Sequence, residues 1–211
     1  MRTDDFISLL AQDTASPGNF RAAFTMAAAG GVIIAAVLFF AALGFRPDIS
    51  EAMRSGRFLF KFVVTIALAV TAAGIVRRLG APTGSLARRG GVLTLAPALL
   101  LGAVVFELIA TPAGQWEARL IGRNAGLCLT LIPLLAIGPL ACFLAALRRG
   151  APANPGLAGA IAGLAASGVA ATFYAANCAD DSPLFVAAWY PMAALVVAAA
   201  GFLIGRKLLR W

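Results

Sequence analysis

Six apolar stretches follow one another along the 211-residue chain. Each is close to the roughly 20 mostly apolar residues that an α-helix needs to cross the hydrocarbon core of a bilayer. They are Ala22–Gly44, Phe58–Val76, Gly91–Ala110, Ala125–Leu147, Gly156–Ala176 and Leu184–Gly205. The pattern predicts an all-α protein, a polytopic membrane bundle of six transmembrane helices.

The polar segments between these stretches are short and rich in Pro, Gly, Arg and Asp, as is typical of connecting loops. None is long enough to form a separate globular domain. We therefore expect a cytoplasmic N-terminal tail over residues 1–21, a six-helix domain over 22–205 and a basic cytoplasmic C-terminus over 206–211. The tail lacks the apolar core of a signal peptide, so we expect it to be retained.

The distribution of Lys and Arg over the loops predicts the orientation of the bundle, because short basic loops stay in the cytoplasm. The less basic side holds Arg46, Arg54, Arg57, Lys61, Arg119 and Arg123, partly offset by acids. The more basic side holds Arg2, Arg21, Arg77, Arg78, Arg88, Arg89, Arg148, Arg149, Arg206, Lys207 and Arg210. Both chain ends are on this side, so we predict that both lie in the cytoplasm.

Composition agrees with a bilayer as the solvent, since 61% of the residues are hydrophobic, only 12% are charged and the mean hydropathy is +0.91. A net charge of +8 could indicate a nucleic-acid ligand. However, the arginines stand in short clusters at the ends of apolar stretches, which topology explains better. We expect no direct contact with nucleic acid.

Small residues indicate close helix packing in the fifth stretch, where Gly159 and Gly163 form a GxxxG pattern. We interpret it as packing within one bundle rather than as a dimerisation face. In the fourth stretch, Pro133 and Pro139 each remove a helical hydrogen bond and should bend the helix.

The chain contains no histidine, which removes the commonest general base and the commonest transition-metal ligand. It also lacks a phosphate-binding GxxxxGK[ST], a GxGxxG at a helix start and a CxxC. These absences argue against hydrolases and zinc enzymes. We expect no catalytic activity, no cofactor and no metal centre.

Two ionisable residues lie inside apolar stretches, Lys61 in the second and Glu107 in the third. Charges within a membrane are costly and therefore mark functional candidates. Both residues fall near the outer interface. We accordingly interpret them as snorkelling side chains or as a mutual ion pair between neighbouring helices, ahead of an ion-conducting or substrate-binding role.

The predicted topology places Cys128 and Cys178 on the outer side and Cys142 near the cytoplasmic end of the fourth helix. Along that helix Cys128 and Cys142 are about 21 Å apart and cannot bridge. For Cys128 and Cys178 three interpretations remain open: a structural disulfide, a thiol pair that senses oxidants or soft metals, and incidental small side chains. Asp180 and Asp181 are either additional metal ligands or a solvated loop.

The N-terminal tail combines acids with an apolar stripe, and a short helix there would be capped by Thr3 or Asp4. Such a helix can offer its face to the groove of a soluble partner or lie on the bilayer surface. The candidate partner-binding residues are Asp4, Asp5, Phe6, Ile7, Leu9 and Leu10.

Several stretches together resemble a known family of bacterial inner-membrane proteins, the negative regulators of sigma F, which are small six-helix anti-sigma factors. The resemblance covers nearly the whole chain. The matching stretches are Met1–Ile7, Phe45–Ile49 followed by Lys61, Leu127–Leu135, Ala145–Pro152, Asn177–Phe185 with Trp189 and Tyr190, and Leu208–Trp211.

The resemblance implies that the protein holds an extracytoplasmic-function sigma factor at the membrane until a stress releases it, and that Cys128 and Cys178 matter to signalling. Cys142 matches no family motif. Family members often have His before the second cysteine, where this chain has Asn177. That departure weakens metal sensing more than thiol redox sensing. The rival classes are a small-molecule transporter or channel and a membrane thiol oxidoreductase.

Overall fold

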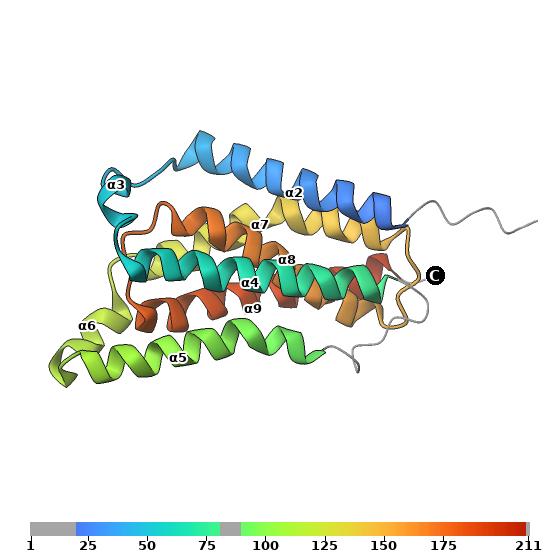
Figure 1. The fold of residues 1–211 in the computed structure, drawn as a ribbon. Helices are drawn as coiled ribbons and strands as arrows, with labels where there is room; N and C mark the ends of the chain where they lie inside the picture. The colour runs from blue at the N-terminus through green and yellow to red at the C-terminus, as the bar shows by residue number, and fades with distance from the viewer. Residues whose placement is uncertain (1–19, 81–89, 210–211) are drawn as a thin grey trace, which may run out of the picture.

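The computed structural model describes residues 20–80 and 90–209, and within these ranges the chain is helical with no strand. The six principal helices are α2 (Phe20–Ala42), α4 (Gly56–Leu79), α5 (Leu95–Ala110), α7 (Ala125–Leu147), α8 (Pro155–Ala175) and α9 (Pro183–Leu208), arranged as a bundle (Figure 1). A 3-10 turn over Gly90–Thr94 leads into α5. All six spans are long and apolar enough to cross a membrane. The predicted six-helix architecture is thus confirmed.

Part of the predicted organisation lies outside the described residues. This concerns the N-terminal tail with Asp4, Asp5, Phe6, Ile7, Leu9 and Leu10, most of the basic segment between α4 and α5, and the last two residues. The predicted role of the N-terminal tail in partner binding therefore stays a prediction.

The helix starts follow from local sequence. Asn154 caps α8 by accepting a hydrogen bond from the Leu157 amide at 3.0 Å, and Ser182 caps α9 by accepting one from the Leu184 amide at 3.3 Å. In both helices a proline follows the cap, where its missing N–H costs nothing. α7 contains Pro133 and Pro139 but remains a single helix with the predicted bounds.

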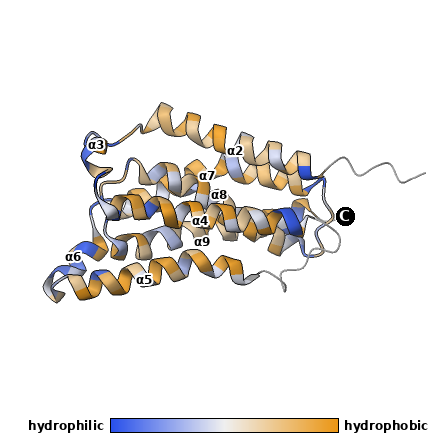
Figure 2. Cartoon of the chain, in the orientation of Figure 1, coloured by the Kyte–Doolittle hydropathy of each residue, from blue (hydrophilic) through white to orange (hydrophobic). Residues whose placement is uncertain are grey.

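The two ends of the bundle differ in what they carry. At the end where α2 begins and α9 finishes, here called the terminal end, the polar residues are mostly arginines (Figures 1 and 2). The opposite end holds the short helices α3 (Ile49–Ala52) and α6 (Trp116–Ile121) together with Cys128 and Cys178, and is called the thiol end. Between the two ends the helices are largely apolar (Figure 2).

The Ala- and Gly-rich helix α8 forms the centre of the bundle, packed against α4, α7 and α9. A Cβ atom added at Gly159 would collide with the Gly201 carbonyl of α9, and one added at Gly163 would lie 2.7 Å from Ala198 Cα. The GxxxG pattern therefore allows backbone contact between two helices of the same chain. The predicted packing within one bundle is confirmed.

This close approach yields a stability prediction. Gly163→Ala should lower the free energy of unfolding by about 1–3 kcal/mol, because the new methyl group must push α9 away from α8. Gly74→Ala in α4 is the matched control, since nothing lies within 4 Å of the added Cβ. Thermal unfolding in detergent compares the two variants. Equal unfolding temperatures would show that the α8–α9 contact is not tight.

Candidate functional site

The loop over residues 176–182, here called the Cys178 loop, connects α8 to α9 at the thiol end. It is tied to the connection after α2 by two hydrogen bonds. The Arg46 amide donates to the Ala176 carbonyl at 3.2 Å, and Asn177 Nδ2 donates to the Gly44 carbonyl at 3.1 Å. Gly44 has a φ of 69°, a left-handed conformation that favours glycine.

Lys61 reaches this loop from α4 and is only 1% exposed. Its ammonium group donates to the Cys178 carbonyl at 2.9 Å and pairs with Asp181 Oδ1 at 2.6 Å. A longer contact of 3.5 Å joins it to the Asp180 carbonyl. All three donors of the ammonium group are therefore directed at one loop.

Arg46 approaches the same loop from the side of α2. Its guanidinium pairs with Asp181 Oδ2 at 2.9 Å and with Asp48 at 2.6 Å. The hydrogen bond from Arg46 holds the pKa of the exposed Asp48 carboxyl below its usual value, and the same bond raises the pKa of Arg46. Asp181 thus lies between two cations and is not a free, solvated acid.

Asp180 fixes the loop to the start of α7. Its Oδ2 accepts hydrogen bonds from the Arg123 amide at 3.0 Å, the Asn124 amide at 2.9 Å and Asn124 Nδ2 at 2.8 Å. The turn before them needs Gly122, which has a φ of 59° and where any side chain would collide with the Phe185 ring. The start of α7, and Cys128 one turn further on, are held against the Cys178 loop.

Glu107 anchors the peripheral helix α5 to the same end. Its buried carboxylate pairs with Arg57 of α4 at 2.8 Å and with Arg119 of α6 at 2.6 Å. Ser182 Oγ donates to it at 3.4 Å. The predicted ion pair between Lys61 and Glu107 is therefore wrong, because the two side chains enter different clusters and each has other partners.

The structure brings Cys128 and Cys178 close together as free, buried thiols. Cys128 Sγ lies 3.5 Å from Tyr174 Oη, and the Tyr174 ring lies 6.2 Å from the Tyr190 ring. Cys142 is far from this cluster, beside Gly30 of α2.

The environment of the Cys178 thiol favours its ionised form. The hydrogen bond from Cys128 and the positive charge of Lys61 lower the pKa of Cys178 to about 7, against the opposing effect of burial.

A metal centre has little support in the described part of the chain, where no three His, Cys, Asp or Glu side chains gather in a way that could hold an ion. Arg46 and Lys61 pair with the two carboxylate oxygens of Asp181, and Asp180 Oδ2 accepts from the amides at 123 and 124. The groups at this site that can react are instead the thiols of Cys128 and Cys178.

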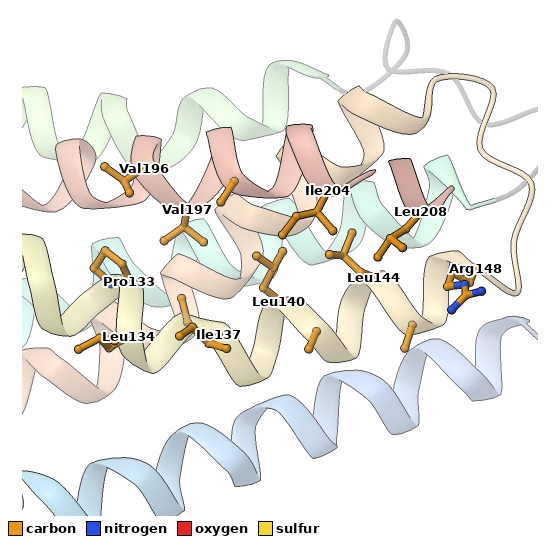
Figure 3. Close-up of a pocket in the computed structure, with 14 residues that line it drawn as sticks. Pro133, Leu134, Ile137, Leu140, Leu144, Arg148, Val196, Val197, Ile204 and Leu208 are labelled. Carbon is orange, nitrogen blue, oxygen red and sulfur yellow. The ribbon is translucent and has the colours of Figure 1, made fainter. Parts of the chain in front are cut away.

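A groove of about 540 Å³ between α7 and α9 offers no comparable chemistry (Figure 3). Apolar side chains such as Ile137 and Leu140 line it, and Arg148 at its terminal end is its one charged lining residue. The candidate site is therefore the thiol end.

The role of Asp180 can be measured. Asp180→Ala removes three hydrogen bonds to the start of α7 and should lower the free energy of unfolding by about 2–3 kcal/mol. Glu117→Ala, on the exposed surface of α6, should change it by less than about 0.5 kcal/mol. Denaturant unfolding in detergent provides the comparison. Similar losses of unfolding free energy in both variants would show that Asp180 does not fix the Cys178 loop to the start of α7.

Comparison with known proteins adds independent information. The family model described as "Negative regulator of sigma F" matches residues 10–211. The chain is 36% identical over 219 aligned residues to "Anti-sigma-F factor NrsF" of Caulobacter vibrioides. It is 31% identical over 214 residues to "Probable anti-sigma-F factor NrsF" of Azospira oryzae. Each alignment covers 100% of both proteins.

No solved structure matches the chain. The family match spans all six principal helices and includes the Cys178 loop. The relatives align from end to end, so the likeness is not confined to generic apolar helices. The chain belongs to the family of negative regulators of sigma F.

Proposed function

We propose that the chain holds a sigma factor of the extracytoplasmic-function class at the bacterial inner membrane and releases it when a stress signal reaches Cys128 and Cys178. The family supports a negative regulator of a sigma factor. The proposal that Cys128 and Cys178 sense the signal rests on one observation. The two free thiols lie buried beside each other at the thiol end, next to the ion pair of Lys61 with Asp181.

Charge supports an orientation with the terminal end in the cytoplasm. Of the six described cations at the thiol end, Arg46, Arg57, Lys61 and Arg119 are paired with acids, and Arg54 and Arg123 are not. At the terminal end the described cations have no acidic residue beside them in the sequence: they are Arg21, Arg77, Arg78, Arg148, Arg149, Arg206 and Lys207. By the positive-inside rule, this orientation puts the thiols on the oxidising side of the membrane.

The proposed partner-binding element is the acidic, apolar-striped tail with Asp4, Asp5, Phe6, Ile7, Leu9 and Leu10, together with the basic segment 77–89. In the proposed orientation both face the cytoplasm, where a sigma factor is found. An amphipathic segment of this kind can occupy a groove on a soluble protein.

The proposed signal runs along α7. Cys128 lies in its first turn and Arg148 directly follows its last residue, about 30 Å away at 1.5 Å per residue. A chemical change at the thiol pair alters how the start of α7 packs on the Cys178 loop, and the helix transmits that change to the terminal end.

A truncation tests the tail. Deletion of residues 2–19, which keeps α2 whole, should abolish binding of the co-expressed sigma factor and restore sigma-dependent transcription. The paired substitution Leu9→Asp and Leu10→Asp should do the same, whereas Asp13→Asn, outside the proposed stripe, should bind normally. Co-purification and a transcriptional reporter give the readouts. Undiminished repression by the truncated protein would exclude the tail from partner binding.

Substitution of both outer cysteines tests the sensor. A Cys128→Ser and Cys178→Ser variant should still repress but should not release the sigma factor after treatment with an oxidant or a soft metal. Cys142→Ser, far from the thiol pair, serves as the control and should respond like the parent. A double variant whose reporter response equals that of the parent would contradict sensing at this pair.

The rival functions have weaker support. A transporter or channel would need charged groups deep in the bundle, whereas the buried Lys61 and Glu107 lie at the thiol end, each in ion pairs with other side chains. A thiol oxidoreductase typically carries a closely spaced CxxC pair, and the sequence has none.

A further inference from the structure

We propose that Cys178 is the reacting thiol of the pair, that Lys61 is the positioning residue that maintains its reactivity, and that Cys128 is the second thiol. This inference rests on the proposed function, in which the pair is the sensor, and it assigns unequal roles to two cysteines that the sequence does not distinguish.

Lys61 contacts the main chain of the residue whose side chain reacts. Its ammonium group lies 2.9 Å from the Cys178 carbonyl oxygen and 2.6 Å from Asp181 Oδ1. The two contacted residues, Cys178 and Asp181, stand on either side of Asp180 in the loop. They fix the backbone at Cys178 and therefore the position of its sulfur beside Cys128.

A buried charge is an expensive way to fix a loop. Burying an ammonium group carries a large desolvation cost, which a neutral hydrogen-bond donor at the same place would avoid. The face of the Phe58 ring lies 5.2 Å from Lys61 Nζ and adds a cation–π contact. The Lys61 side chain thus lies close to the Cys178 thiol, where its charge favours the thiolate.

The acids around Cys178 do not cancel this charge. The Asp180 carboxylate receives three N–H donors at 123 and 124, and the Asp181 carboxylate is shared between Lys61 and Arg46. Arg46 also reaches the Cys178 carbonyl at 3.5 Å. The Asp180 charge opposes ionisation of Cys178, but less strongly than the Lys61 charge favours it.

The environment of Cys128 differs. Its side chain is fully buried in α7, and its partners are the uncharged Tyr174 hydroxyl of α8 and the Cys178 thiol. Tyr190 of α9 closes the cluster beside Tyr174, with the two ring centroids 6.2 Å apart. Cys128 can donate to a Cys178 thiolate, which stabilises the charge on Cys178 rather than on itself.

The unchanged protein provides the first test. Purified chain in nanodiscs, without sigma factor, is treated briefly with iodoacetamide at pH 7, so that a thiolate forms a bond to carbon and iodide leaves. Peptide mass mapping then counts the label on each cysteine. Cys178 should be labelled at least about tenfold faster than Cys128. Equal labelling, or faster labelling of Cys128, would overturn the assignment.

The second test concerns Lys61. Lys61→Gln keeps a donor for the Cys178 carbonyl without the charge, and should slow Cys178 labelling at pH 6.5 by about threefold or more, the change that a half-unit rise in pKa gives. Lys61→Arg should stay within about twofold of the parent. Arg57→Gln, which removes a cation of the same helix that pairs with Glu107, is the matched control.

A pH profile of labelling separates charge from structure. In the Lys61→Gln variant, the pH at which Cys178 labelling is half-maximal should rise. Simple loosening of the loop would instead speed labelling at every pH. A midpoint identical to that of the parent would refute the role of Lys61. Where Lys61→Gln does not fold, Cys128→Ala tests the same environment and should also raise the midpoint. These labelling experiments need no sigma factor. Their outcome therefore tests the assignment of Cys178 separately from the proposed regulation.

Discussion

The ammonium group of Lys61, buried among the oxygen atoms of the Cys178 loop, is the contact on which the thiol end depends. A charge removed from water must be paired and hydrogen-bonded, and here a single loop supplies every acceptor. The same loop joins α8 to α9, receives Arg46 from the side of α2 and binds the start of α7 through Asp180. It thereby connects the ends of four helices around two thiols.

The rest of the bundle supports this arrangement by close packing. Gly159 and Gly163 let α9 approach the backbone of α8, and Gly168 lets α4 approach α8 from another side. These contacts fix the helices that carry Lys61 and the Cys178 loop. α5 packs more loosely at the periphery and is fastened at the thiol end through the two ion pairs of Glu107. Polar contacts thus cluster at one end of an otherwise apolar bundle.

Much of this fold could be predicted from the sequence, because helix length, apolar content and cap residues such as Asn154 and Ser182 act locally. The common side of Cys128 and Cys178 followed from counting spans. Their contact did not, because it depends on how α7 packs against the loop. The pairing of Lys61 with Asp181 joins residues 120 positions apart, and the sequence offered Glu107 as an equally plausible partner.

The central claim is that the state of the thiol pair controls the affinity of the chain for its sigma factor. The most direct measurement is the dissociation constant of the complex in nanodiscs before and after oxidation of the thiols with diamide. The account predicts at least about a tenfold weaker complex after oxidation of the parent protein, a change of roughly 1.4 kcal/mol, and no change in the variant lacking both outer cysteines. Equal affinity of the parent protein in both states, with Cys128 and Cys178 verified as oxidised, would contradict it.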